Sequence, residues 1–447
     1  MSPTRRDFLK ATGTAAAGAG LGVATPVFAQ TPASGSTPPA GPKRRYAIIG
    51  TGVRGVGMWG RPLLQRYGDV VEFVGLCDIN PKRAELAKAA LGVSCPTFDS
   101  FEKMCDTVKP ELLTVTTVDR FHADYIVKAL DRGIDVITEK PMVTDEAQCQ
   151  RVLDAEARNR RKIVVGFNYR FAPKHVKIKE ILQSGEIGTV TGVDFHWYLD
   201  TTHGADYFRR WHRLRENGSL WTHKATHHFD LINWWLAADP VEVQAYGELS
   251  HYGAKGPFHH TNCRPCPDKG ACPFYWDITK GGRGMTLYTE AESVDGYLRD
   301  GCVFKNDIDI WDTMSASIRY SNNVLMSYSL NTFMPIEGYH LAFNGTKGRL
   351  EVRDYERQPW DPGMETDISV IRNFGRREKV EIPKADGGHG GGDSRLQDLI
   401  FRKVDAPDYL RLPDSRAGAM SCLTGIAARK SVIDKRAVKI ADLVKIS

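Results

Sequence analysis

Long apolar runs are missing from the 447-residue sequence beyond its N-terminal segment. No later stretch approaches the roughly 18 continuous apolar residues that a membrane-spanning helix needs. The chain also lacks a dominant charge, because 60 Lys and Arg against 54 Asp and Glu leave a formal charge of only +6. Paired cations such as Arg209-Arg210 are typical of solvated faces. We therefore expect no stable membrane span and no nucleic-acid partner.

Low-complexity composition and internal repeats are absent as well. With 42% hydrophobic and 26% charged residues, the composition is that of an ordinary soluble globular protein. A chain of this length is expected to hold two or three domains, with enough residues to bury a sizeable core.

The N-terminal segment has the pattern of an export signal. Thr4-Arg5-Arg6-Asp7-Phe8-Leu9-Lys10 precedes a weakly apolar, Ala- and Gly-rich stretch from Ala11 to Val27. This pattern predicts a twin-arginine signal over residues 1–29, a linker over 30–43, and the Tat export machinery as a partner. The mature protein is then expected in the periplasm or outside the cell.

Cysteines are few and mostly scattered. There are nine, and only Cys263, Cys266 and Cys272 cluster, inside a Gly/Pro/Cys-rich segment that we expect to form a long loop over residues 257–284. Two interpretations stay open for the cluster: a disulfide with one spare thiol, or three ligands of a structural metal completed by His259 or His260. An oxidising compartment favours the disulfide.

Alternation of apolar runs with amphipathic stretches predicts an α/β domain over residues 44–166. Runs such as Tyr46 to Ile49, Val71 to Leu76 and Leu112 to Val115 have the texture of buried strands, and helical spacing separates them. Such alternation closes into a doubly wound parallel sheet, a Rossmann domain. Residues 167–447 instead predict an α+β domain with a large, mostly antiparallel open sheet and a C-terminal helix over 415–435.

A glycine-rich turn follows the first predicted strand and opens a helical pattern. In Gly50-Thr51-Gly52-Val53-Arg54-Gly55, the three glycines suit a tight turn, close approach to a pyrophosphate, and helix packing on the strand. Asp78 ends the second strand, where its carboxylate is placed to accept hydrogen bonds from adenosine ribose hydroxyls. This favours NAD, although Lys82 and Arg83 lie nearby and leave NADP open.

Two further motifs resemble the Gfo/Idh/MocA superfamily of oxidoreductases. They are Thr116-Thr117-Val118-Asp119-Arg120-Phe121-His122-Ala123, with Val118 where the family usually has Pro, and Thr138-Glu139-Lys140-Pro141-Met142. The resemblance implies that Lys140 touches both the nicotinamide ribose and the substrate hydroxyl. It places Thr117, His122, Glu139, Asn168 and Arg170 near the cofactor. A desolvated lysine beside a cationic ring is expected to have a lowered pKa, which suits proton transfer.

The densest polar stretch, Trp221 to Asp230, resembles the family's substrate-side helix. The family's Asp-x-x-x-His pair appears here as His223 and His227, so the usual aspartate is missing and His227 is left as the expected acid/base. We expect Trp221, His223 and Lys224 beside the substrate. His223 and His227 also have metal-ligand spacing, but a zinc site needs a third ligand, and no His-Glu-x-x-His pattern exists, so no metal is predicted.

Export combined with a nicotinamide cofactor predicts a redox-closed reaction. An exported enzyme cannot exchange spent NAD(P) with the cytoplasmic pool, so we expect the dinucleotide to be tightly bound. The expected activity is hydride transfer at a hydroxyl carbon of a sugar or glycoside. The alternatives are an NAD-dependent glycosidase or epimerase that acts by transient C3 oxidation, and a non-catalytic sugar-binding member. An exposed open sheet also predicts a homo-oligomer.

Overall fold

The computed structural model describes residues 41–445 apart from 283, 361–362, 364 and 384–386. The predicted signal segment and most of the linker therefore lie outside the described residues. Residues 40–447 form one compact unit. Across the described part of the chain, no helix combines the length and the apolar character needed to cross a bilayer.

The first half of this unit is a six-stranded parallel sheet in the order β3-β2-β1-β4-β5-β6, which confirms the predicted doubly wound domain. The strands are β1 Arg44–Ile49, β2 Val71–Cys77, β3 Thr97–Phe98, β4 Leu112–Val115, β5 Asp135–Thr138 and β6 Ile163–Val165. The crossover helices are α1 Arg61–Tyr67, α2 Pro81–Leu91, α3 Phe101–Val108, α4 His122–Asp131 and α5 Glu146–Asn159. A π-helical turn, Gly55–Gly60, joins the glycine-rich turn to α1.

The second half contains a nine-stranded sheet in the order β14-β13-β12-β11-β7-β10-β9-β8-β15. Only β7 and β10 pair in parallel, so the predicted mostly antiparallel sheet is confirmed. Its strands are β7 Val190–Asp200, β8 Pro240–Glu248, β9 Thr313–Tyr320, β10 Leu325–Met334, β11 Glu337–Gly345, β12 Gly348–Arg357, β13 Glu365–Arg372, β14 Arg377–Lys379 and β15 Val438–Lys439.

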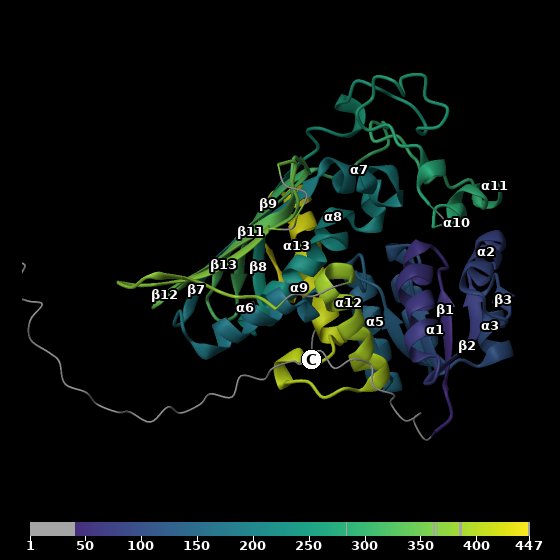
Figure 1. The fold of residues 1–447 in the computed structure, drawn as a ribbon, viewed down its shortest axis with the longest axis horizontal. Helices are drawn as coiled ribbons and strands as arrows, with labels where there is room; N and C mark the ends of the chain where they lie inside the picture. Colours follow the sequence, from purple (N-terminus) through teal and green to yellow (C-terminus); the bar gives the residue numbers. More distant parts are fainter. Residues whose placement is uncertain (1–40, 283, 361–362, 364, 384–386, 446–447) are drawn as a thin grey trace, which may run out of the picture. The chain divides into compact units, whose positions relative to one another are not determined.

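Helices of the second half lie between the two sheets and above the first one (Figure 1). They are α6 Pro173–Ser184, α7 Thr201–Arg209, α8 Ser219–His223, α9 Ala225–Leu236, α10 Thr286–Thr289, α11 Glu292–Asp295, α12 Gly392–Gln397 and α13 Ser415–Asp434. The short helices α10 and α11 belong to the long connection between β8 and β9, which reaches across to α2.

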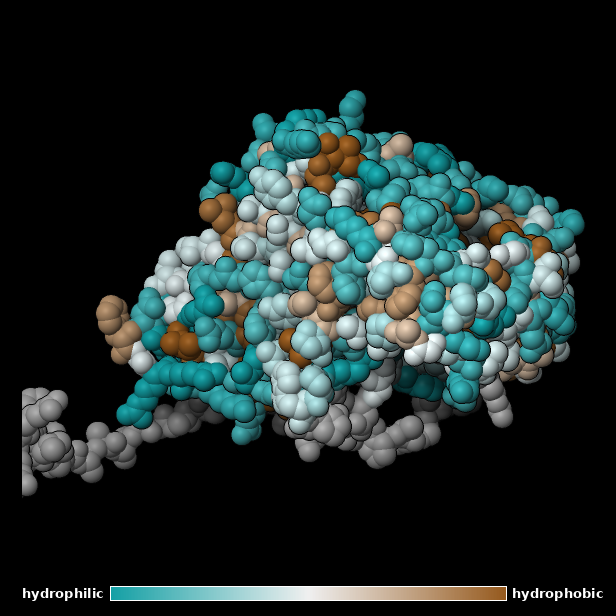
Figure 2. All heavy atoms as spheres, turned by 90° about the horizontal axis from the view of Figure 1, so that it is seen from above, coloured by the Kyte–Doolittle hydropathy of each residue, from teal (hydrophilic) through white to brown (hydrophobic). Residues whose placement is uncertain are grey.

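The wet face of the large sheet is built from small polar side chains. Ser315, Ser317 and Ser327 alternate with buried neighbours along β9 and β10, which is the period-two pattern of a strand with one solvated face. The molecular face in Figure 2 is mainly hydrophilic, with apolar residues scattered among polar ones. Oligomerisation through the open sheet stays a prediction.

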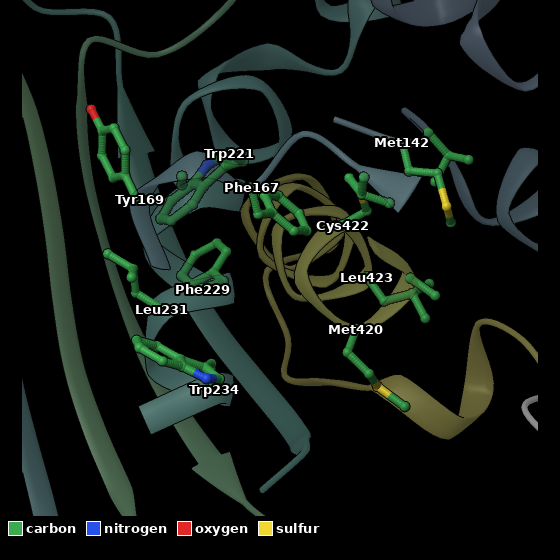
Figure 3. Packing of buried hydrophobic residues seen from close by; sticks show 14 of the residues in the cluster. Met142, Phe167, Tyr169, Trp221, Phe229, Leu231, Trp234, Met420, Cys422 and Leu423 are labelled. Atoms are coloured by element: carbon green, nitrogen blue, oxygen red, sulfur yellow. The ribbon is translucent and has the colours of Figure 1, made fainter. Parts of the chain in front are cut away.

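Helix α13 is the central buried element, and it contacts both halves. Its glycines allow this, because a Cβ at Gly418 would lie 2.8 Å from Met142 Sδ, and a Cβ at Gly425 would lie 2.1 Å from the carbonyl oxygen of Trp221. Figure 3 shows the coils of α13 among side chains from both halves, including Met142, Phe167 and Trp221. The two sheets are therefore held to one helix at close backbone distance.

Replacing Gly425 with Ala tests this contact. Alanine improves helix propensity by about 0.8–1 kcal/mol over glycine. The added Cβ meets backbone, which no side-chain rotation relieves, and overpacking of this kind costs about 1–3 kcal/mol or more. We expect Gly425→Ala to lower the midpoint of thermal unfolding. Gly270→Ala is the control, since a Cβ there meets nothing within 4 Å. An unchanged or raised midpoint for Gly425→Ala would contradict the packing argument.

Candidate active site

A large cavity of about 1320 Å³ opens at the carboxyl ends of the parallel strands, facing α7, α8 and α9. Small-molecule sites commonly span about 300–1,000 Å³. This cavity therefore has room for a dinucleotide and a second small molecule. Ligands of open α/β sheets bind at this edge, where the strand order reverses.

The glycine-rich turn presents backbone to the cavity. Gly50 has a φ of +89°, and a Cβ there would lie 2.5 Å from the backbone carbon of Thr116, so the turn requires glycine. At Gly52 a Cβ would meet only the Tyr288 ring, with the hydroxyl at 2.9 Å. The Gly52 backbone thus faces the cavity with only a side chain, and no backbone, against it, and the residues present fit a dinucleotide.

Asp78, at the end of the second strand, organises the turn. Its Oδ2 accepts hydrogen bonds from the Thr51 amide at 2.8 Å and the Thr51 hydroxyl at 3.1 Å. Its Oδ1 accepts from the Asn80 amide at 2.9 Å and from Arg83 Nη1 at 3.2 Å. The carboxylate therefore holds the turn to the start of α2.

The connection between β8 and β9 closes over this end of the cavity. Arg83 Nη2 donates to Asp295 at 2.6 Å, Arg83 Nε donates to the Leu287 carbonyl at 3.2 Å, and Asn80 Nδ2 donates to the Ala291 carbonyl at 2.9 Å. Tyr288 accepts a hydrogen bond from the Val53 amide at 3.2 Å. Residues 285–299 are hereafter called the clasp, because they tie the second half of the chain to the nucleotide-binding turn.

The Glu139-Lys140 turn joins the first half to α8. Glu139 Oε1 accepts from Arg54 Nε at 2.6 Å and from Trp59 Nε1 at 2.7 Å, which fixes the turn beneath the glycine-rich segment. Lys140 Nζ lies 3.2 Å from His223 Nε2 and donates to the His223 carbonyl at 3.1 Å. Burial lowers the pKa of Lys140 to about 7, so the amine exchanges its proton readily near neutral pH.

His223 contacts a carboxylate, although the family's usual aspartate is missing at this position of the motif. His223 Nδ1 lies 2.5 Å from Asp119 Oδ2 and 2.9 Å from His212 Nε2. Burial raises the pKa of Asp119 well above its ordinary value and lowers the pKa of both histidines well below theirs. Asp119 thus comes from the loop after β4 rather than from α8.

His227 lies one helical turn beyond His223 and faces the same cavity. Its ring stacks on Tyr169 with centroids 4.3 Å apart and planes 11° from parallel. Its Nδ1 is buried and has no hydrogen-bond partner among the described residues. Burial holds the pKa of His227 well below its ordinary value, so the ring is a neutral imidazole.

Lys224 is an almost fully buried cation on the same wall. Its Nζ lies 4.7 Å from the centroid of the Trp197 ring and 3.4 Å from the Tyr169 hydroxyl. Burial lowers the pKa of Lys224. Cation–π contact with aromatic faces therefore takes the place of an acidic partner.

Most of the predicted site residues line this cavity. Those that do are Gly50, Gly52, Val53, Arg54, Asp78, Thr117, His122, Glu139, Lys140, His223, Lys224 and His227. His122 reaches two carbonyl oxygens, of Pro141 at 2.8 Å and of Thr117 at 3.0 Å, so it also ties neighbouring loops together.

Five predicted residues do not belong to the lining: Thr51, Gly55, Asn168, Arg170 and Trp221. Arg170 forms an ion pair with Asp230 at 2.5 Å, and Asn168 donates to His389 Nδ1 at 3.0 Å and to Asp393. Trp221 is fully buried against α13. The structure therefore gives Arg170 and Asn168 polar partners within the protein.

The cysteine cluster is separate from the cavity. Cys263, Cys266, Cys272 and Cys302 line a pocket of about 20 Å³, and all nine cysteines of the chain are free thiols. The disulfide expected from the compartment is therefore not formed. No cysteine of the described residues belongs to a group of ligand atoms close enough to hold an ion.

Sequence reasoning assigned no role to Asp119, His212 and Tyr288. Asp119 stands inside a recognised motif, three residues before His122, but nothing in the motif indicates that it faces His223. His212 and Tyr288 come from turns and short helices whose position is set by tertiary packing. A pattern along one chain segment therefore carries no signal for these contacts.

Comparison with known proteins matches both halves of the chain to one family. Residues 44–167 match the Gfo/Idh/MocA oxidoreductase family, NAD-binding Rossmann fold, and residues 179–440 match its C-terminal alpha/beta domain. Residues 2–22 match the twin-arginine translocation pathway signal sequence, which confirms the predicted export across the membrane.

Individual relatives agree with this match. YteT of Bacillus subtilis (strain 168), whose name places it among the oxidoreductases, is 39% identical over 90% of this chain and 98% of its own length. Inositol 2-dehydrogenase of Salmonella paratyphi B is 30% identical over 44% of this chain and 56% of its own. An Agrobacterium radiobacter oxidoreductase, solved with NAD⁺, L-tartaric acid and magnesium, shares the fold with a TM-score of 0.63 and 14% identity, covering 90% of this chain and 100% of its own.

Neighbouring histidines on α9 allow a matched test of the cavity wall. We expect His227→Leu to lower the rate of dinucleotide reduction about 10²–10⁴-fold, the usual contribution of a positioned acid/base, with no loss of thermal stability because the lost Nδ1 has no partner. His228 lies away from the cavity, and its Nδ1 is 2.7 Å from the Tyr328 hydroxyl. Its replacement should therefore have the opposite effects on rate and stability. His228→Leu is expected to lower the unfolding midpoint and spare the rate. Equal rates in the two variants would remove His227 from the chemistry.

Proposed function

The chain belongs to the Gfo/Idh/MocA oxidoreductase family, and from that premise we propose that it transfers hydride between a hydroxyl carbon of a sugar or glycoside and a tightly held NAD. The observation that carries the proposal is the meeting of Lys140 with His223 in the cavity that the glycine-rich turn also lines. This contact places a proton-exchanging amine next to the substrate side of a nucleotide-binding edge.

The chain's own residues supply binding and proton transfer, while NAD, when bound, supplies the hydride acceptor. The neutral imidazole of His227 and the amine of Lys140 are the two groups placed to take the hydroxyl proton of a substrate. Glu139 holds the Lys140 turn in position through Arg54 and Trp59. The proton then leaves the substrate oxygen as its carbon loses hydride.

Preference for NAD over NADP is proposed from the contacts of Arg83. An arginine at the end of the second strand serves a 2′-phosphate only when its guanidinium is free. Here Arg83 is 8% exposed and bound to both Asp78 and Asp295. A 2′-phosphate would break these pairs and add its own negative charge beside two carboxylates.

A sugar or related polyol is the proposed substrate class. Aromatic side chains of Tyr169, Tyr207 and Trp211 line the substrate half of the cavity, where ring faces pack against the C–H faces of sugars. The relationship to inositol 2-dehydrogenase supports a cyclic polyol or pyranoside. The non-catalytic alternative is weakened because Asp119 supplies the carboxylate that the α8 motif lacks.

Export and the clasp together favour a resident cofactor. A chain carried out of the cytoplasm cannot draw fresh dinucleotide, and the clasp covers the turn that holds it. The reaction is then redox-closed: a second substrate returns the hydride, or one substrate is oxidised and reduced again. The second version is that of an NAD-dependent glycosidase or epimerase working through transient oxidation at C3.

Denaturing the exported protein tests the resident cofactor. We expect release of about one NAD(H) per chain, and little NADP(H), when protein purified from the exported fraction is denatured and its supernatant is separated by chromatography. Aryl glycosides and free sugars are then supplied to the native protein. Glycoside cleavage without net NADH selects the glycosidase, and oxidation of one sugar coupled to reduction of another selects the oxidoreductase. Absence of any dinucleotide would overturn the carried-cofactor proposal.

The clasp is tested through its ion pair. Asp295→Ala removes one of the two carboxylates that bind Arg83, so we expect bound dinucleotide to be released about tenfold faster or more, a loss of about 1.4 kcal/mol or more. The rate of release is measured after the protein is diluted into a solution of an enzyme that consumes free NAD. Asp277→Ala, in the same connection but bonded among the described residues to Thr279 and Lys280 alone, is the control with an unchanged release rate. Identical rates in both variants would show that the clasp does not retain the cofactor.

A further inference from the structure

Three potential metal ligands from three separate segments converge on the cavity wall. Asp119 lies in the turn after β4, His212 lies in the turn after α7, and His223 ends α8. These residues are at most 9% exposed, and one ligand atom of each lies within 4.8 Å of the other two. In the described part of the chain, no other such group occurs.

Hydrogen bonding alone does not satisfy this cluster. If His223 carries its hydrogen on Nδ1, that one hydrogen faces both Asp119 Oδ2 and His212 Nε2. If His212 instead donates from Nε2 to His223 Nδ1, Asp119 Oδ2 has no donor from this pair. A doubly protonated His223 would place an N–H against the Lys140 amine, which already donates to the His223 carbonyl. With Asp119 ionised and His223 neutral, the contacts at His223 Nδ1 therefore leave one lone pair of the cluster without a donor of its own.

A second observation concerns His212. Its Nδ1 is buried and has no hydrogen-bond partner in the described part of the chain, so no contact there fixes which ring nitrogen carries the hydrogen. Nε2 points into the cluster, where it is free to present a lone pair. Buried polar atoms are normally paired, and unpaired ones often mark an ion or a functional group.

We propose that Asp119, His212 and His223 bind one divalent transition metal ion, with zinc as the expected metal. Two imidazoles and one carboxylate form the three-ligand set of open metal sites, whose remaining position takes water or substrate. Zinc bonds of about 2.0–2.2 Å at tetrahedral angles separate ligand atoms by roughly 3.3 Å, so the contacts of 2.5 and 2.9 Å at His223 must widen by several tenths of an ångström when the ion binds. Because all three residues line the cavity, the open position faces the substrate space.

Under the proposed function, on which this role rests, the ion holds the substrate hydroxyl oxygen. The ion does not change its oxidation state: the carbon loses hydride to the dinucleotide, and the hydroxyl proton passes to Lys140 beside the site. Ligation through His223 Nδ1 leaves His223 Nε2 directed at Lys140. The histidine that replaces the family's usual aspartate is then a metal ligand rather than a defective acid.

Metal content of the folded protein is the direct test. Full-length mature protein, purified without chelators, is expected to carry about one zinc per chain by mass spectrometry. Replacement of zinc with Co²⁺ should give visible bands of a nitrogen and oxygen ligand set. Thiolate charge-transfer bands in the near ultraviolet would instead place the ion at the cysteine cluster and overturn the proposal. So would the absence of binding at micromolar free Zn²⁺ or Co²⁺.

Variants locate the ion independently of activity. Loss of a second-shell group costs about 10–100-fold in metal affinity, so Asp119→Asn and His212→Asn should each weaken zinc binding by about 100-fold or more. His227→Leu, on the same wall but outside the cluster, and the pair Cys263→Ser with Cys266→Ser should bind normally. Undiminished binding by folded Asp119→Asn or His212→Asn overturns the site. If neither variant folds, the cobalt spectrum of the unaltered protein decides.

Removal of the metal with a chelator tests the role of the ion separately from the oxidoreductase proposal. We expect metal-free protein to retain its dinucleotide, since none of the three ligands belongs to the glycine-rich turn, and to lose sugar-dependent turnover until zinc is returned. Full turnover without metal would overturn the ion's role and leave the hydride-transfer proposal standing. Absence of turnover in zinc-loaded protein with every sugar and glycoside tried would count against the proposed function alone, because the metal stoichiometry is measured separately.

Discussion

The packing of α13 between the two sheets is the constraint on which the rest of the structure depends. Gly418 brings the helix against the edge of the first sheet, and Gly425 brings it against the backbone of α8. This close approach sets the distance between Lys140, in the turn after β5, and the helix that ends at His223. A cavity lined by both the glycine-rich turn and α8 is the result. The positions of the reactive groups in this cavity depend on how α13 is packed.

Much of the fold was predictable because its signals are local. Buried runs marked all but the shortest strand of the first sheet, and the glycine-rich turn was identified from its place between β1 and a helix. Alternating burial likewise marked β9 and β10. The clasp was not predictable, since α10 and α11 are four residues each, and their place beside α2 depends on ion pairs with a residue more than two hundred positions earlier.

The candidate site was predictable only where its residues belong to one short motif of the sequence. Lys140, His223 and His227 belong to recognisable motifs, and the structure brings all three to the cavity. Asp119 and His212 meet His223 from turns that are 104 and 11 positions away, and no spacing rule connects them. Arg170 shows the opposite outcome: it stands in a recognisable motif, but its charge is neutralised by Asp230 within the second half of the chain. Charge in a motif indicates that a group needs a partner, but tertiary packing decides whether the partner is a ligand or another side chain.

The clasp also imposes an order on synthesis. The last strand of the first sheet ends at Val165, so a ribosome adding about 5–20 residues per second completes that sheet roughly seven to twenty-six seconds before Asp295 exists. During that interval the glycine-rich turn has formed without its cover and is exposed to the nucleotides of the compartment in which the chain is made. A part of the chain that is made later therefore covers a turn that an earlier part has already supplied.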